Sequence, residues 1–318
     1  MSTKLLVSLV CPFYNEELGV HAFYEAVCHE LSQLELGGYE FEVICVDDGS
    51  EDDTLKHLIK LTLEDQRFKV VELSRNFGKE AALTAGLDLA KGDLIIPLDS
   101  DLQDPPSLIG QLIRAWENSD ADVVLAKRND RRSDSFSKRI TAAAFYDTYN
   151  FIAHHKIPTD VGDCRLMTRI VVDALKLLPE KQRFMKGLFA WVGFKTITID
   201  YVRQPRVAGS SKFSIWKLWN FALEGITSFS TLPLRFWTYI GVTGALVTVT
   251  YGFFIMLRTL IFGADIPGYA SLFVGLLFLG SVQLIGIGVL GEYMGRTYME
   301  AKNRPTYLIR KTYQQPEK

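Results

Sequence analysis

Residues 94–104 have the sequence Leu-Ile-Ile-Pro-Leu-Asp-Ser-Asp-Leu-Gln-Asp, an apolar run that ends in acids. The run predicts a buried strand, and Asp99 and Asp101 lie two positions apart, so their side chains point the same way where the strand ends. Two carboxylates leave room for diphosphate oxygens and water around Mg²⁺ or Mn²⁺. Taken alone, such a pair is more often a solvated turn than a metal site. The neighbouring motifs therefore decide the interpretation.

Two other apolar runs end in polar turns of the same kind. Residues 7–17 predict a strand that stops near Pro12 before a polar turn and a helix, and residues 41–50 predict a strand that ends in Asp47, Asp48 and a glycine turn. Strands that are each followed by a helix form a mostly parallel α/β sheet, in which ligands bind outside the carboxyl ends of the strands. We therefore expect the acids of all three runs at one sheet edge.

Four motifs follow one another along this part of the chain: P-x-Y-N-E at Pro12–Glu16, V-D-D-G-S at Val46–Ser50, N-x-G-K at Asn76–Lys79 and D-S-D-L-Q-D at Asp99–Asp104. In this order they resemble glycosyltransferase family 2, the inverting nucleotide-sugar transferases. The resemblance implies a GT-A catalytic domain, an α/β fold with a Rossmann-like, mostly parallel sheet. It also implies that Asp99 and Asp101 hold the metal, with Gln103 as a further ligand. The residues that it places at the nucleotide sugar are Pro12, Tyr14, Glu16, Asp47, Asp48, Gly78 and Lys79.

Three later motifs narrow the resemblance: Gly162–Leu166, Arg183–Gly187 and Arg203–Phe213. With them the chain resembles the polyprenyl-phosphate glycosyltransferases, relatives of dolichyl-phosphate mannose synthase, and most closely the bactoprenol glucosyltransferases. The Q-x-x-R-W element of processive polysaccharide synthases is not matched at residues 182–184. The resemblance implies transfer of a hexose to a polyprenyl phosphate, with UDP-glucose as the expected donor. Another sugar, such as mannose from GDP-mannose or an amino-arabinose, is the alternative.

Basic residues are expected to bind the acceptor phosphate. Arg128 follows the strand-like residues 122–126, and the guanidinium fork suits phosphate oxygens. We assign Arg128 and Arg139 to the acceptor phosphate. Arg206 and Lys212 are expected to hold the nucleotide diphosphate from a loop.

By the family resemblance, Asp163 is the acid usually called the catalytic base. A phosphate monoester has its second pKa near ~6 and is mostly dianionic at neutral pH, so little proton has to be removed. Asp163 can therefore position the attack or deprotonate the acceptor. We count it with Asp99 and Asp101 as catalytic.

Two uncharged runs, residues 236–257 and 269–291, each have close to the ~20 residues that cross a bilayer as a helix. They predict a transmembrane hairpin in a chain whose mean hydropathy is +0.09. Lysine and arginine are concentrated outside the hairpin connector, which places both termini and the catalytic domain on the cytoplasmic side. The expected location is the bacterial inner (plasma) membrane, with two spans.

The segment before the hairpin has an amphipathic pattern. Its apolar residues recur at helical spacing: Ile215, Leu218, Trp219, Ala222, Ile226 and Phe229. This favours a helix in the headgroup plane, and a helix packed on the catalytic domain is the alternative. The predicted division is a GT-A domain over residues 1–210, an interfacial segment over 211–235, the hairpin over 236–295 and a basic cytoplasmic tail over 296–318.

Other features exclude several classes. Residues 286–291 spell G-x-G-x-x-G, but no strand precedes them, so these small residues predict close helix packing within the hairpin or in a homo-oligomer. The net charge of -2 gives no indication of a nucleic-acid partner. A non-catalytic nucleotide-sugar-binding membrane protein is disfavoured by the intact acids, and a transporter by the single hairpin without an intramembrane charge pair. The four cysteines have no C-x-x-C spacing and are expected in the core.

Overall fold

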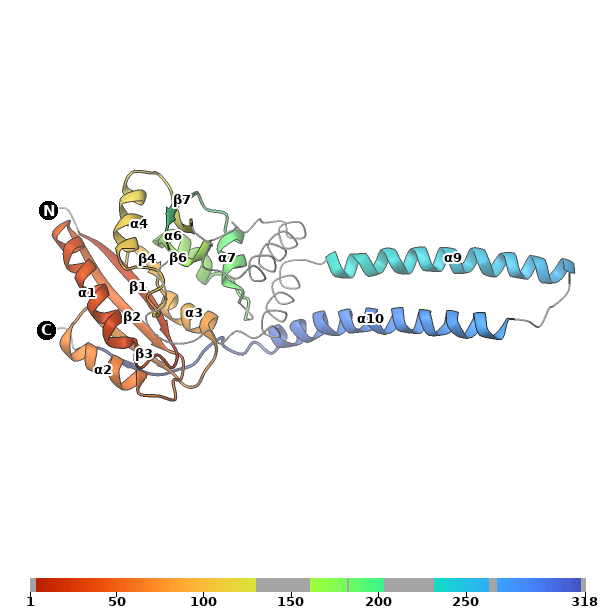
Figure 1. The fold of residues 1–318 in the computed structure, drawn as a ribbon, viewed down its shortest axis with the longest axis horizontal. Coiled ribbons are helices and arrows are strands. Elements are labelled where there is room, and N and C mark those ends of the chain that lie inside the picture. The colour runs from red at the N-terminus through yellow and green to blue at the C-terminus, as the bar shows by residue number, and fades with distance from the viewer. Residues whose placement is uncertain (1–3, 130–160, 182, 203–231, 263–267, 316–318) are drawn as a thin grey trace.

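The computed structural model describes residues 4–129, 161–181, 183–202, 232–262 and 268–315. Within these residues the strands are β1 (Leu5–Phe13), β2 (Tyr39–Asp47), β3 (Phe68–Leu73), β4 (Leu94–Pro97), β5 (Val123–Arg128), β6 (Val161–Thr168), β7 (Thr196–Tyr201) and β8 (Ile309–Tyr313). The helices are α1 (Val20–Leu36), α2 (Thr54–Glu64), α3 (Lys79–Leu89), α4 (Ser107–Glu117), α6 (Arg169–Lys176), α7 (Met185–Trp191), α9 (Leu232–Phe262) and α10 (Tyr269–Ala301). Figure 1 shows the sheet and its helices at one end, with α9 and α10 leading away from them.

The strands form one mixed sheet in the order β7-β5-β6-β4-β1-β2-β3-β8. The central pairs β4/β1, β1/β2 and β2/β3 are parallel, as the three apolar runs predict. Strand β6 is antiparallel to both of its neighbours, β4 and β5. The predicted α/β sheet is confirmed, and the carboxyl ends of the parallel strands β1, β2, β3 and β4 lie at the same edge of the sheet.

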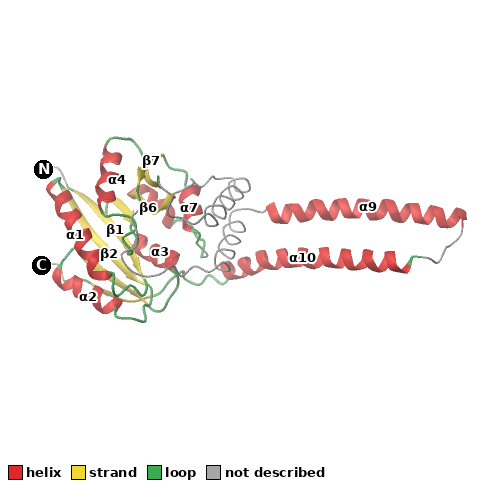
Figure 2. Ribbon diagram, viewed as in Figure 1, coloured by secondary structure: helices red, strands yellow, loops and turns green. Residues whose placement is uncertain are grey.

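Helices cover both faces of the sheet (Figure 2). Successive side chains of a strand point to opposite faces. Accordingly, Val7 and Leu9 of β1 pack in a cluster with buried residues of α1, α2 and α4. Val10 of the same strand packs in a second cluster with residues of α3, α6 and α7. The result is a three-layer α/β/α domain in which the sheet lies between two helical layers, with one hydrophobic core on each face.

Strand β8 joins the sheet from beyond the long helices. It pairs antiparallel with β3. The hydroxyl of Tyr313 donates to Glu72 at 2.8 Å, and Arg310 contacts the same carboxylate at 3.0 Å. The hydroxyl of Tyr307 donates to Asp88 in α3 at 2.8 Å. Residues 296–318 are predicted to be a separate basic tail, whereas residues 309–313 lie inside the catalytic sheet.

Helices α9 and α10 contain the two predicted spans. At ~1.5 Å per residue, helices of 31 and 33 residues are long enough to cross a bilayer. By length and apolar composition, one stretch of the described residues qualifies as a span, Phe278–Ala301, and α9 contributes the shorter apolar piece Tyr239–Thr248. The two-span hairpin is therefore not confirmed. At Gly286 an added Cβ would lie 3.3 Å from the ring of Trp237, so this small residue lets the two helices approach.

Two further expectations meet different outcomes. Three cysteines, Cys11, Cys45 and Cys164, are buried and Cys28 is half-buried, as expected of core residues. Most of the predicted interfacial segment, 211–235, lies outside the described residues.

The first prediction concerns β8. Removing residues 306–318 deletes the strand pairing and at least three polar contacts to β3 and α3, each worth about 1 kcal/mol. At about 2–4 °C per kcal/mol for a domain of this size, the midpoint of thermal unfolding in detergent should fall by roughly 6 °C or more. Tyr313→Phe, which loses one hydrogen bond, is the matched control and should fall by only about 2–4 °C. An unchanged midpoint in the shortened chain would show that β8 does not stabilise the domain.

Candidate functional site

The carboxyl end of β4 and the amino end of β6 lie at the same sheet edge because these strands are antiparallel. Their register pairs Leu94 with Thr168. Continued beyond β4, the same register sets Asp99 opposite Asp163. Like charges directly opposite each other destabilise a sheet, so this edge needs a cation.

Lys79 supplies that cation from the first turn of α3. Its Nζ lies 2.7 Å from Asp99 Oδ1 and 2.6 Å from Asp163 Oδ2. The Lys79 side chain is 46% exposed, and those of Asp99 and Asp163 are 27% and 21% exposed. The three groups, which come from three separate elements, therefore form a charged cluster that a ligand can reach.

The cluster fixes the charge states of its members. Burial raises the pKa of Asp163, but the charges of Lys79 and Lys186 outweigh it and hold that pKa well below its usual range. Burial raises the pKa of Asp99, and Lys79 only partly opposes this. For Lys79, burial lowers the pKa, but the two carboxylates outweigh burial and raise it. Asp163 is thus a carboxylate, and Lys79 an ammonium, at neutral pH.

Asp48 positions Lys79 through the backbone. One carboxylate oxygen of Asp48 accepts from the N–H of Phe77 at 2.7 Å, and the other accepts from the N–H of Gly78 at 2.9 Å. Gly78 has φ +98°, a conformation that favours glycine, and α3 begins at the next residue. Sequence analysis assigns Asp48 and Gly78 to the nucleotide; in the structure they also shape the loop that presents Lys79.

Gly49 allows two loops of the site to touch. Its φ is +66°, and an added Cβ would lie 2.4 Å from the carbonyl carbon of Arg75. Asp47, two residues before Gly49, is buried, and its Oδ2 accepts a hydrogen bond from the N–H of Ser50 at 3.2 Å. Its Oδ1 has no hydrogen bond among the described residues. Burial raises the pKa of Asp47.

The loop after β1 is tied to the loop after β2. The N–H of Asn15 donates to Ser50 Oγ at 3.0 Å, and Asn15 Oδ1 accepts from the N–H of Glu51 at 2.8 Å. The N–H of Glu16 donates to Thr54 Oγ1 at 2.8 Å. These bonds hold the predicted nucleotide residues Pro12, Tyr14 and Glu16, all half-buried, beside the ends of β1 and β2. Asn15, with φ +52°, therefore links the two loops, a structural role that its motif alone does not indicate.

The predicted metal residues follow β4. Oδ1 of Asp101 accepts from the N–H of Gln103 at 3.1 Å, and Leu102 between them has φ +55°. Across the described ranges no three His, Cys, Asp or Glu side chains gather as a metal site. The donor set is nevertheless of the kind that Mg²⁺ or Mn²⁺ takes, because both ions bind few protein oxygens and keep water or phosphate oxygens. Asp99, Asp101 and Gln103 therefore fit a substrate-bridged cation.

Arg128 ends β5 on the other side of Asp163. Its Nε donates to the hydroxyl of Tyr201 at 3.3 Å, and that hydroxyl donates to the buried Asp104 at 2.5 Å. An added Cβ at Gly162 would lie 3.5 Å from Nη2 of Arg128, so the guanidinium lies against the start of β6. Arg139, Arg206 and Lys212 lie outside the described residues.

Glu80 and Lys186 have no predicted role. Oε2 of Glu80 accepts from the N–H of Met185 at 3.3 Å, which joins the start of α3 to the start of α7. Burial first, and then the charge of Asp163, raise the pKa of Glu80 to about 7. Lys186 lies inside the motif Arg183–Gly187, whereas Glu80 lies one residue beyond the motif Asn76–Lys79.

The chain is similar to several known proteins. A family model described as Glycosyl transferase family 2 matches residues 8–176. The SfII prophage-derived bactoprenol glucosyl transferase of Shigella flexneri is 53% identical over 307 residues, which is 96% of this chain and 98% of that protein. The prophage bactoprenol glucosyl transferase homolog of Escherichia coli K12 is 53% identical over 96% of this chain and 98% of its own length. The crystal structure of Mycobacterium tuberculosis glucosyl-3-phosphoglycerate synthase has a TM-score of 0.47 and 21% identity over 70% of this chain and 78% of that chain.

The second prediction follows from Glu80. Its pKa is near 7 when folded and near ~4.3 when unfolded, so between these values the folded state binds more protons. Stability should therefore fall as pH rises from about 4.3 to 7. Glu80→Gln keeps an acceptor for Met185 and loses this titration. In metal-free buffer its unfolding midpoint should exceed that of the wild type increasingly from pH 5 to 8.

The exposed Glu64→Gln is the matched control and should follow the wild type at every pH. Parallel curves for wild type and Glu80→Gln would contradict the raised pKa.

Proposed function

The chain belongs to glycosyl transferase family 2, and from this premise we propose that it transfers glucose from UDP-glucose to a polyprenyl phosphate at a membrane. It is a glycosyltransferase by family. The observation that carries the proposal is the 53% identity, over nearly the full length of both chains, to a protein named as a bactoprenol glucosyl transferase. The cluster of Asp99, Lys79 and Asp163 supports it, because each charge has a use in this reaction.

The reaction does not depend on a general base, because the acceptor phosphate is already mostly ionised at neutral pH. An oxygen of the acceptor phosphate attacks the anomeric carbon of glucose, the bond from that carbon to the β-phosphate oxygen breaks, and UDP leaves with the bonding electrons. The dianionic acceptor, with a second pKa near ~6, becomes a monoanionic diester. Asp163, held ionised by Lys79, is then a positioning group at the attacking face. Correct positioning lowers the barrier by several kcal/mol.

Charge on the leaving diphosphate has to be stabilised as the bond breaks. We assign Asp99, Asp101 and Gln103 to hold Mg²⁺ or Mn²⁺, which supplies that stabilisation when bound. Lys79 adds a fixed positive charge beside Asp99. The remaining nucleotide-sugar residues are proposed as the sequence predicts: Pro12, Tyr14, Glu16, Asp47, Asp48 and Gly78 at the described edge, with Arg206 and Lys212. Arg128 and Arg139 are proposed for the acceptor phosphate.

A membrane hairpin is supported by the path of the chain. Strand β7 precedes α9, strand β8 follows α10, and both strands belong to the same sheet. A chain that leaves a domain and returns to it crosses a membrane an even number of times. If Phe278–Ala301 crosses the membrane, a second crossing accompanies it, and α9 is long enough to make it. We propose that both helices span a bacterial plasma membrane with the catalytic domain cytoplasmic, and that copies associate through them.

The third prediction tests the reaction itself. The full chain in detergent with Mn²⁺ and polyprenyl phosphate should release UDP from UDP-glucose and yield a lipid heavier by one hexose, measured by mass spectrometry. GDP-mannose should give at most a trace of product. Preferential use of GDP-mannose would make the sugar assignment wrong, and the lack of transfer from any nucleotide sugar would contradict the proposal.

The fourth prediction tests the metal residues. Asp101→Asn leaves the contacts of Lys79 with Asp99 and Asp163 intact, so folding should be preserved. The value of kcat/KM should fall about 10²–10³-fold, as for loss of one stabilising group in a preorganised site, and the metal concentration for half-maximal rate should rise. The exposed Asp200→Asn is the matched control and should resemble wild type. Normal turnover by Asp101→Asn, or by wild type in excess chelator, would remove the metal assignment.

A further inference from the structure

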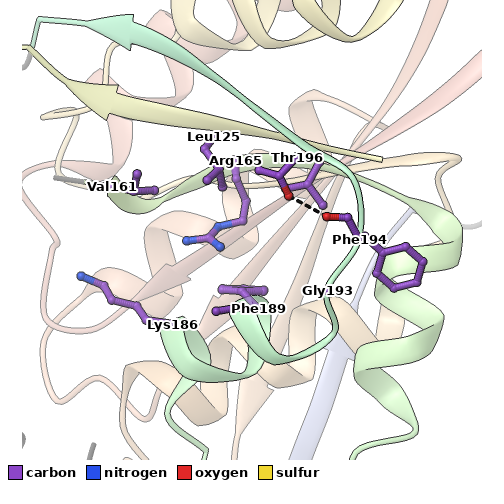
Figure 3. A pocket seen from close by; sticks show the side chains of 10 residues that line it. Leu125, Val161, Arg165, Lys186, Phe189, Gly193, Phe194 and Thr196 are labelled. Carbon is purple, nitrogen blue, oxygen red and sulfur yellow. Dashed lines mark hydrogen bonds between the residues drawn. The ribbon is translucent and has the colours of Figure 1, made fainter. Parts of the chain in front are cut away.

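A pocket of about 150 Å³ lies between the β5-β6-β7 end of the sheet and helix α7. Its apolar and aromatic wall is made by Val123, Leu125, Val161, Phe189, Ala190 and Phe194. Gly193 and Thr196 also line the pocket. Two cations, Arg165 from β6 and Lys186 from α7, complete the lining, and Figure 3 shows them reaching toward the same part of the pocket. Pockets for whole drug-sized ligands start near ~300 Å³, so this volume fits one part of a larger ligand.

The two cations are in different situations. Arg165 is nearly buried, donates to the carbonyl oxygens of Gly162 and Asp163, and stacks on Phe189 with its guanidinium 3.9 Å from the ring centroid. Lys186 forms no hydrogen bond or ion pair with any residue that the structure describes. The nearby carboxylates are engaged, since Asp163 is held by Lys79 and Glu80 accepts from Met185. The pocket therefore offers, beside an apolar wall, an ammonium group that makes no hydrogen bond or ion pair within the described residues, although its charge acts on Asp163 and Glu80 nearby.

The pocket adjoins the reacting groups. Asp163 and Arg165 lie two positions apart on β6, so they point to the same face of the sheet. Lys186 is close enough for its charge to lower the pKa of Asp163. The pocket therefore adjoins Asp163, the group that the proposed function assigns to positioning the attacking acceptor.

We propose that this pocket binds the phosphate-proximal end of the isoprenoid acceptor, with Lys186 as a further cation on the phosphate besides Arg128 and the apolar wall receiving the first isoprene unit. The inference rests on the proposed function and deepens it. An anionic group joined directly to a branched hydrocarbon is the one part of the two substrates that matches a cation beside an apolar wall. The diphosphate of the donor is joined to polar sugars on both sides and does not match.

The fifth prediction separates acceptor binding from donor binding. Lys186→Met keeps the length of the side chain and removes its charge. Loss of a charge-assisted hydrogen bond should raise the acceptor KM about tenfold or more, measured with geranyl phosphate and with polyprenyl phosphate. The Kd for UDP-glucose, from direct titration without acceptor, should change less than twofold. Lys186→Arg should restore most of the acceptor affinity, and the exposed Lys60→Met is the matched control.

The apolar wall is tested by Ala190→Phe, which fills the pocket without changing charge and should raise the acceptor KM while leaving the Kd for UDP-glucose unchanged. This variant and Lys186→Arg carry the test if Lys186→Met does not fold. The pocket assignment would be overturned if Lys186→Met folds and its acceptor KM equals that of an active wild type. The proposed function would then still stand. An equal loss of donor affinity would overturn the pocket assignment also, because Lys186 would then bind the donor. Lack of transfer by wild type would overturn both.

Discussion

The ammonium of Lys79 lies between two carboxylates that the sheet would otherwise set against each other. Asp99 and Asp163 face one another because β4 and β6 are antiparallel, and each is within 2.7 Å of Lys79 Nζ. The position of Lys79 depends in turn on Asp48, whose two oxygens hold the turn before α3. Asp48 reaches that turn because Gly49 lets the two loops touch. Three loops of the edge, after β2, before α3 and after β4, are therefore coupled to Asp163 at the start of β6, and a change in any of them should alter the surroundings of Asp163.

The second constraint is the return of the chain to the sheet through β8. Edge strands with unpaired backbone groups are prone to association, and β8 covers the edge of β3. It also fastens the carboxyl end of α10 to the catalytic domain, and near that end the N–H of Lys181 donates to Glu300 at 2.9 Å. The carboxyl end of α10 is thus anchored to the catalytic domain.

The parts of the site that sequence could predict are those written in consecutive residues. Apolar runs ending in acids located the ends of β1, β2 and β4, because burial and strand direction are both local signals. The contact of Lys79 with Asp163 joins residues 84 apart in sequence, and it depends on a strand register that no local pattern specifies. Strand β8 was missed because its residues are mostly exposed and two of them are charged, so it lacks the alternation of a half-buried strand. Lys186 was quoted within a motif, but only the packing of α7 under β6 indicates what its charge faces.

The central claim is that Lys79 keeps Asp163 ionised at the attacking face. The direct measurement is the titration of Asp163 by ¹³C NMR of aspartate-labelled protein, assigned with Asp163→Asn, in metal-free wild type and in Lys79→Met. In the wild type the Asp163 carboxylate should stay ionised well below the ordinary aspartate pKa of about 3.9, and in Lys79→Met its pKa should rise markedly. An ordinary pKa in the wild type, or the same titration in both proteins, would contradict the account.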